Sequence, residues 1–144
     1  MIKQYSNNDC VPAQFINVLK YFYTDMIPAM AIETVYRQSF DIENGTSIYA
    51  IIHIAELLNY YTDLHFECYT SDFEAHLKDE LSRNGIVMVV RTFNKNMHVV
   101  IVYKIENDMV KVFDSATKLD SQSYKISKLL YKANMIVCVR RENL

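Results

Sequence analysis

The sequence predicts an α+β fold in which helices come first and a mostly antiparallel sheet follows. Apolar residues at helical spacing dominate the first half, whereas β-rich runs separated by short polar turns dominate the second. Hydrophobic residues make up 51% of the 144 residues, and the chain has two Gly and two Pro. Such a composition can fill a core, and we expect one domain spanning residues 1–144.

Four helices are predicted in the first half. In the segment 11–23, apolar residues recur every three or four positions, and Pro12 suits a first helical turn because its missing N–H costs nothing there. The other helices are expected over about 29–38, 47–60 and 71–82, with the alternating strand "LHFECY" before the last of them.

The second half contains four runs that favour strands, namely "IVMVVRTF", "HVVIVYKI", "MVKVFD" and "MIVCVRR". The turn "ENDM" between the second and third runs is typical of a hairpin. A short helix is expected over about Ser127–Ala133, before the last strand. Because strands follow helices without a repeating strand–helix order, a parallel sheet is not expected.

Composition excludes several functional classes. A net charge of −2 and a pI near 6.1 give no indication of a nucleic-acid or anionic membrane partner. No apolar run approaches the roughly 18–20 residues of a spanning helix, so we expect no direct membrane span and no secretory signal. Three distant cysteines without a CxxC pair indicate a reducing, cytoplasmic compartment.

We also expect neither a cofactor nor a metal. Two glycines in the whole chain cannot form a phosphate-binding glycine loop. His65 and Cys68 are three residues apart on a predicted strand, so their side chains point to opposite faces and cannot share a metal ion.

Cys10 is the first candidate for chemistry. It follows a polar loop and directly precedes the first predicted helix. The N–H groups and positive dipole end of a helix N-terminus stabilise a thiolate, which is the nucleophilic form of cysteine. The alternative is a small buried apolar residue, and from the residues alone both interpretations stay open.

A cysteine nucleophile needs a base, and four histidines compete for this role. We expect His76 to be solvated on a helix, His53 to pack beside isoleucines, and His65 to face solvent from a strand. His98 opens the strand "HVVIVYKI" after a polar turn, and strand ends beside loops commonly present catalytic side chains. His98 is therefore the candidate base.

Asp114 and Gln4 complete the candidate set. Asp114 ends the strand "MVKVFD", and the predicted hairpin places it roughly opposite His98, within reach of a His–carboxylate hydrogen bond that would orient the imidazole. Gln4 lies six residues before Cys10, where its amide could donate to an oxyanion beside the thiol. Taken singly, Asp114 is also typical of a strand end and Gln4 of a surface position.

Together these positions resemble a known family. The segments "QYSNNDCVPA" and "HVVIVYKIENDMVKVFDSATK" resemble the bacterial papain-like cysteine peptidases that cut double-glycine leader peptides from bacteriocin precursors, usually as the N-terminal domain of an ABC exporter. The similarity covers nearly the whole chain, including "GTSIYAIIHIAELLNYYTDLHFECY" and "GIVMVV". It implies a papain-like cysteine peptidase fold with Cys10 as nucleophile and His98 as base. It also implies Asp114 as the orienting residue and Gln4 as the oxyanion-hole donor.

The chain departs from the family pattern in two places. Val11 stands where the family has Gly directly after the cysteine, which affects the S1 side and the substrate assignment. The segment "DSATK" lacks the family's Pro and Gly after the aspartate, which affects a turn more than the chemistry.

The resemblance implies a cysteine peptidase that removes a leader after a small residue pair, with a leader peptide as substrate and an ABC exporter as a possible partner. One alternative is an acyltransferase or amidase that uses the same Cys-His site. Another is a non-catalytic domain that binds a leader or a partner, and a last one is a small α+β domain in which the four residues coincide by chance.

Overall fold

The computed structural model describes residues 10–39, 48–93, 96–114 and 122–142. In chain order its elements are α1 (Cys10–Phe22), α2 (Ala29–Ser39), α3 (Ile48–Tyr61), β1 (Leu64–Tyr69), α4 (Phe73–Ser82), β2 (Ile86–Phe93), β3 (Asn96–Glu106), β4 (Met109–Asp114), β5 (Gln122–Lys125), α5 (Ile126–Leu130) and β6 (Ala133–Arg141).

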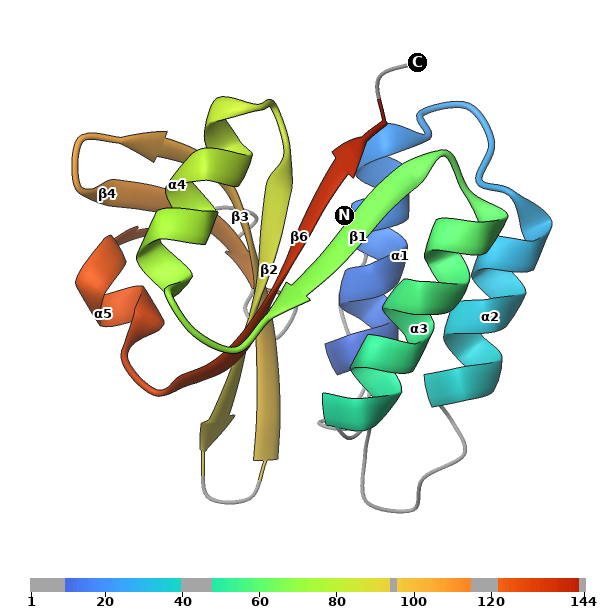
Figure 1. The fold of residues 1–144 in the computed structure, drawn as a ribbon, viewed down its shortest axis with the longest axis horizontal. Helices are drawn as coiled ribbons and strands as arrows, with labels where there is room; N and C mark the ends of the chain where they lie inside the picture. The colour runs from blue at the N-terminus through green and yellow to red at the C-terminus, as the bar shows by residue number, and fades with distance from the viewer. Residues whose placement is uncertain (1–9, 40–47, 94–95, 115–121, 143–144) are drawn as a thin grey trace.

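A six-stranded sheet joins the two halves of the chain (Figure 1). Its strands lie in the order β1-β6-β2-β3-β4-β5, and every neighbouring pair in this order is antiparallel. The last strand, β6, lies between β1 and β2 and so ties the C-terminal end of the chain to the N-terminal half. The predicted α+β layout with an antiparallel sheet is confirmed.

Helices cover both faces of the sheet. The helices α1, α2 and α3 lie on one side, and α4 and α5 lie on the other (Figure 1). Along β2, Ile86, Met88 and Val90 face the first group, whereas Val87 and Val89 face the second. Because both faces are apolar, this central strand is a continuous hydrophobic run rather than an alternating one.

Helix α1 packs on the sheet through side chains spaced three and four residues apart. Phe15, Val18 and Leu19 are completely buried, and Val11 is 3% exposed. Burial of each such side chain contributes about 1.5–3 kcal/mol. This packing places the N-terminal end of α1 against the sheet.

The predicted helices are confirmed, with ends that differ by a residue or two, except for the last. The helix expected over Ser127–Ala133 ends at Leu130 in the structure. The helix cannot continue because Tyr131 is extended (φ −61°, ψ 125°) and Lys132 is left-handed (φ 67°). The chain therefore turns into β6 earlier than the sequence pattern indicates.

Strand β5 was not predicted. Its four residues, "QSYK", carry one aromatic side chain and no apolar run, so they lack a strand signal of their own. They pair with β4 at the edge of the sheet, where Tyr124 lies opposite Val110. Pairing with an existing strand, rather than intrinsic propensity, explains this element.

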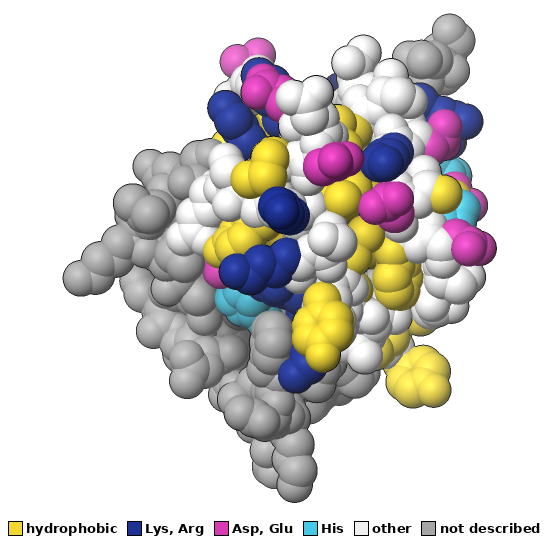
Figure 2. Space-filling view, turned by 90° about the vertical axis from the view of Figure 1, so that its left-hand side faces the viewer, with side chains coloured by type: hydrophobic (Ala, Val, Ile, Leu, Met, Phe, Trp, Pro, Cys, Tyr) yellow, Lys and Arg dark blue, Asp and Glu magenta, His cyan; other side chains and the backbone are white. Residues whose placement is uncertain are grey.

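The surface near β4 and α5 carries charges of both signs. In Figure 2, Lys and Arg side chains on this face are interspersed with Asp and Glu side chains and with apolar ones. One ion pair here joins Lys104 Nζ to Glu106 Oε1 at 2.8 Å.

Within the described ranges, no helix is long and apolar enough to cross a membrane.

Candidate active site

The first candidate residue lies at the start of α1. The helix begins at Cys10, so the main-chain N–H groups of its first turn surround this position. Val11 and Ala13, in the same turn, are 3% and 8% exposed. The side chain of Cys10 and all of Gln4 lie outside the described part of the chain, and their expected roles stay predictions.

His98 and Asp114 form a hydrogen-bonded pair at adjacent strand ends. His98 Nε2 lies 2.8 Å from Asp114 Oδ2. The His98 side chain is 24% exposed and that of Asp114 is 10% exposed, so the imidazole reaches solvent while the carboxylate is turned inward. Because Nε2 bonds the carboxylate, Nδ1 is the atom through which His98 would exchange a proton with a thiol.

The two residues are diagonal neighbours rather than directly opposite. Asp114 pairs with Val100, because a register shift between Val102 and Lys104 moves it one residue along β3 from Ile101, its partner in an unshifted hairpin. His98 is two residues from Val100 and therefore lies on the same face of the sheet as Asp114. The expected hydrogen bond is thus present, although the expected register is wrong.

The other three histidines make different contacts from those expected. His53, expected to pack, is exposed on α3. His76, expected to be solvated, is half-buried because its ring stacks on Tyr69 with centroids 3.6 Å apart. His65 is also half-buried, and its Nε2 lies 3.3 Å from Glu67 Oε2.

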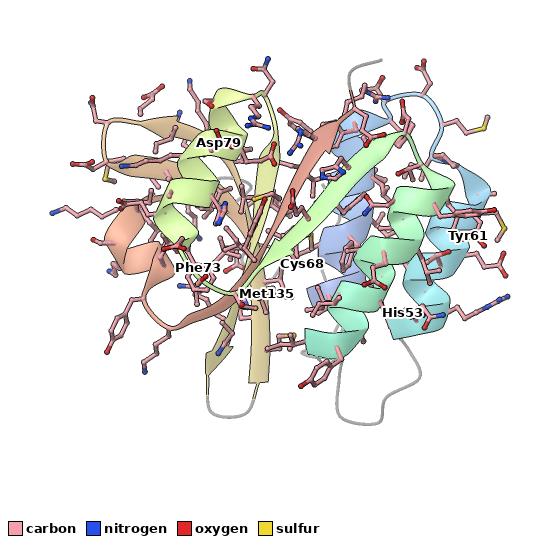
Figure 3. The ribbon with its side chains drawn as sticks, in the orientation of Figure 1. His53, Tyr61, Cys68, Phe73, Asp79 and Met135 are labelled. Atoms are coloured by element: carbon pink, nitrogen blue, oxygen red, sulfur yellow. The ribbon has the colours of Figure 1, made fainter. Side chains whose placement is uncertain are left out.

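The two cysteines whose side chains are described are poor nucleophiles. Cys68 lies on β1 (Figure 3) and Cys138 lies on β6. In the sheet, β2 separates Cys138 from β3, and both β6 and β2 separate Cys68 from β3. Burial raises the pKa of Cys68 to about 11 and that of Cys138 to about 12. Both are therefore protonated at neutral pH, which leaves Cys10 as the candidate nucleophile.

Sequence reasoning missed two polar residues near this site. Gln14 and Asn17, both on α1, are completely buried. Gln14 Nε2 donates to the main-chain oxygens of Val99 and Phe113, at 3.0 and 3.1 Å. A signal was available, because Gln14 and Asn17 interrupt the apolar residues on the buried face of this helix.

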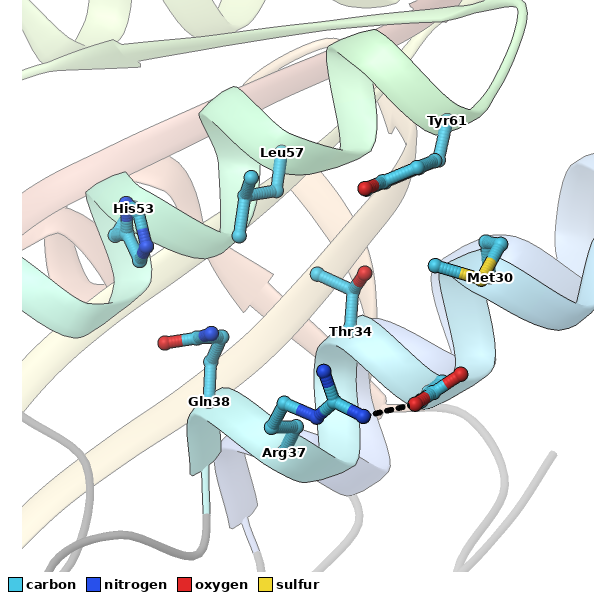
Figure 4. A pocket seen from close by; sticks show the side chains of 8 residues that line it. Met30, Thr34, Arg37, Gln38, His53, Leu57 and Tyr61 are labelled. Atoms are coloured by element: carbon cyan, nitrogen blue, oxygen red, sulfur yellow. Dashed lines mark hydrogen bonds and ion pairs between the residues drawn. The ribbon is translucent and has the colours of Figure 1, made fainter.

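A separate hollow lies between α2 and α3 and has a volume of about 240 Å³ (Figure 4). Arg37 and Glu33 form an ion pair at its edge, and His53 and Tyr61 face it from α3. Its described lining holds no cysteine, so it lacks the nucleophile that a second cysteine-based site would need.

Among the described residues, no group of three His, Cys, Asp or Glu side chains could hold a metal ion.

Comparison with known proteins agrees with this fold. The profile of the Peptidase C39 family matches residues 1–143, and the chain therefore belongs to the peptidase C39 family. Membership supports a cysteine peptidase at the level of the family. A comparison with curated proteins gives no match.

Several solved structures with the same fold are peptidase domains. The peptidase domain of Streptococcus ComA, a bi-functional ABC transporter involved in quorum sensing, is 16% identical with a TM-score of 0.68, over 98% of this chain and 97% of that one. The peptidase domain of Streptococcus mutans ComA is 13% identical with a TM-score of 0.59, over 97% and 98%.

A further neighbour is a double glycine motif protease from an AMS/PCAT transporter, solved in complex with the leader peptide. It is 15% identical with a TM-score of 0.65, over 99% of this chain and 91% of that one. At these identities the likeness establishes the fold, which is that of a C39 peptidase domain.

Proposed function

We propose that the chain is a papain-like cysteine peptidase in which Cys10 is the nucleophile, His98 the base and Asp114 its orienting partner. One observation carries this proposal, namely the 2.8 Å hydrogen bond between His98 and Asp114. The buried amide of Gln14, on the helix that begins at Cys10, contacts both strands of this pair. Membership of the C39 family supports the same reaction.

The reaction would use these groups in sequence. His98 Nδ1 takes the proton of Cys10, and the thiolate attacks the scissile carbonyl carbon. The resulting oxyanion accepts hydrogen bonds from the Cys10 N–H and the Gln4 amide. His98 then gives its proton to the leaving amine, which leaves a thioester on Cys10. Water, deprotonated by His98, hydrolyses the thioester and restores the thiol.

Asp114 has an orienting role in this scheme. Its bond to Nε2 fixes the ring so that Nδ1 is the reacting atom, and its charge stabilises the imidazolium formed with the thiolate. Its side chain, which is 10% exposed, is largely shielded from water that would compete for the carboxylate.

The substrate class comes from the solved neighbours. One of them is a double glycine motif protease in complex with a leader peptide, and another is the peptidase domain of an ABC transporter. We assign a leader peptide that ends in two small residues as the substrate and an ABC exporter, at its cytoplasmic face, as the partner. Val11 is compatible with this assignment because its side chain is buried in the apolar core.

Thiol reactivity tests the proposed nucleophile. We expect limiting iodoacetamide to label Cys10 quickly at about pH 6, and to label it more slowly in His98→Ala and Asp114→Asn. Cys68 and Cys138 serve as internal controls, since their raised pKa values predict slow labelling. If Cys10 reacts only above about pH 8, as an unperturbed thiol does, the proposal is wrong.

Peptide cleavage tests the reaction. A synthetic amphipathic leader ending in Gly-Gly, followed by a short cargo, is incubated with the protein, and the products are identified by mass. We expect cleavage after Gly-Gly that is lost in Cys10→Ala and kept in Cys138→Ala. Capture of the acyl group by an added primary amine in preference to water would indicate an acyltransferase. Binding without cleavage, equal in wild type and Cys10→Ala, would indicate a binding domain.

A further inference from the structure

Gln14 is a buried amide in a largely apolar contact between α1 and the sheet. It lies one helical turn after Cys10 and is completely buried. Its Nε2 carries two hydrogens, and its two acceptors are the main-chain oxygens of Val99 at 3.0 Å and Phe113 at 3.1 Å. One side chain on α1 therefore joins the helix to both β3 and β4.

The two acceptors flank the histidine–aspartate pair. Val99 directly follows His98, and Phe113 directly precedes Asp114. Asp114 also belongs to the last described residue pair between β3 and β4. Gln14 thus contacts the backbone of the two strands within one residue of both members of the pair.

Asn17 fixes the direction of the Gln14 amide. Asn17 Nδ2 donates to Gln14 Oε1 at 3.1 Å, and Asn17 is also completely buried. A flipped amide would place Oε1 against two carbonyl oxygens and its NH₂ group against another NH₂ group. The three hydrogen bonds therefore define one orientation, with the donors directed at the strands.

Packing alone does not explain an amide at this position. A buried amide costs free energy unless it is hydrogen-bonded, and an apolar side chain of similar size contributes comparable stability at such a site. Directional hydrogen bonds fix distance and orientation better than apolar contacts do. The amide is thus suited to hold α1 at a defined position over residues 99 and 113.

We propose that Gln14 is a positioning residue that sets the placement of Cys10 relative to His98 and Asp114. This inference rests on the proposed cysteine-peptidase function. Nucleophile and base must lie in hydrogen-bond reach, and a displacement of about 1 Å can cost about 100-fold in rate. The thiolate–imidazolium pair forms at low pH only if α1 keeps this placement.

The test uses the full chain and the variant Gln14→Met, which keeps length and volume but removes both donors. The rate of Cys10 alkylation by iodoacetamide is measured from pH 5 to 9, with the labelled cysteine mapped by mass. We expect the rate at about pH 6 to fall at least about tenfold, whereas the rate at about pH 9 changes little. A purely structural role would not change the shape of this pH profile.

Two further variants complete the design. Leu77→Ala removes a buried side chain from α4, on the other face of the sheet, and controls for general loss of stability. Asn17→Ala removes the bond that orients the amide but keeps Gln14, and we expect a smaller change in the same direction. If Gln14→Met does not fold, Asn17→Ala carries the test.

The outcomes separate this inference from the function on which it rests. A wild-type Cys10 that is slow at about pH 6 overturns the proposed function, and this inference with it. A fast wild-type Cys10 whose profile is unchanged by Gln14→Met, or changed no more than by Leu77→Ala, overturns the inference alone. If wild-type Cys10 is fast, an unchanged pH profile in Asn17→Ala also overturns the inference alone.

Discussion

Glu80 is a buried carboxylate on α4 whose surroundings leave little room. It is 3% exposed, and Arg140 Nη1 donates to its Oε1 at 2.8 Å. A Cβ atom at Gly85 would lie 2.3 Å from Glu80 Oε2 and 2.7 Å from its Cγ. Gly85 is therefore required for space beside a side chain that its ion pair holds in place.

Gly85→Ala is expected to lower the free energy of unfolding by about 1–3 kcal/mol, because Glu80 must leave its place beside Arg140 or the backbone must shift. Urea unfolding measures this difference. In a Glu80→Ala background the obstacle is gone, and we expect the same substitution to cost less than about 0.5 kcal/mol. An equal cost in both backgrounds would contradict the steric explanation.

The candidate site shows which residues a sequence can indicate. The hairpin turn at "ENDM" indicated that His98 and Asp114 lie on adjacent strand ends, and their hydrogen bond is present. The register could not be predicted, because no sequence signal marks the shift between Val102 and Lys104 that places Asp114 opposite Val100 rather than Ile101. The partners of Gln14 are main-chain oxygens 85 and 99 residues away, which no local pattern can reveal.

At the scale of elements, a polar cluster around Asp63 joins α1, β1 and β6 at their ends. Tyr23 OH donates to Asp63 Oδ1, and Arg141 Nη1 donates to Oδ2 at 2.6 Å. Arg141 Nη2 also donates to the main-chain oxygen of Phe22. The hydrogen bonds from Tyr23 and Arg141 hold the pKa of Asp63 below its ordinary value of 3.8.

We expect Asp63→Asn to lower stability at pH 7 by about 0.5–1 kcal/mol, as is usual for an exposed ion pair in a small network. The folded-state pKa of Asp63 is lower than its unfolded value, so this stabilisation is present above 3.8 and is lost as the pH falls through the folded-state pKa. Urea unfolding of both proteins from pH 7 to 3 should show the two curves converging.

The exposed pair of Glu33 and Arg37 on α2 offers a control for this cluster. Glu33→Gln removes a charge from a single i, i+4 pair and should change stability by less than about 0.5 kcal/mol. A difference between wild type and Asp63→Asn that does not shrink as the pH falls below 3.8 would show that the Asp63 cluster does not stabilise through its charge.

Elements also differ in how far their sequences determine them. The helices α1 to α4 and the strands β2 to β4 could be predicted because each has enough apolar residues at a clear period to bury one or two faces. Strand β5 could not be predicted, because it depends on pairing with β4. The early end of α5 could not be predicted either, because it depends on the left-handed backbone of Lys132.

At the scale of the whole molecule, the antiparallel sheet buries titratable groups in its centre. Cys138, on β6, is 1% exposed, and burial raises its pKa from 9.0 to about 12. In the unfolded chain this thiol ionises near pH 9, whereas in the folded protein it keeps its proton until about pH 12. Between these values the unfolded state holds fewer protons, so stability falls as the pH rises.

This difference predicts how Cys138→Val changes alkaline stability. Between pH 8 and 10, under reducing conditions, wild type should lose about 1.4 kcal/mol more unfolding free energy than Cys138→Val, because this range extends one pH unit above the unfolded pKa of 9.0. Urea unfolding at several pH values provides the measurement. Val137→Ala, beside it on β6 and without a titratable group, should show a constant offset from wild type. Equal pH slopes for wild type and Cys138→Val would mean that burial of this thiol does not limit the stability of the sheet at alkaline pH.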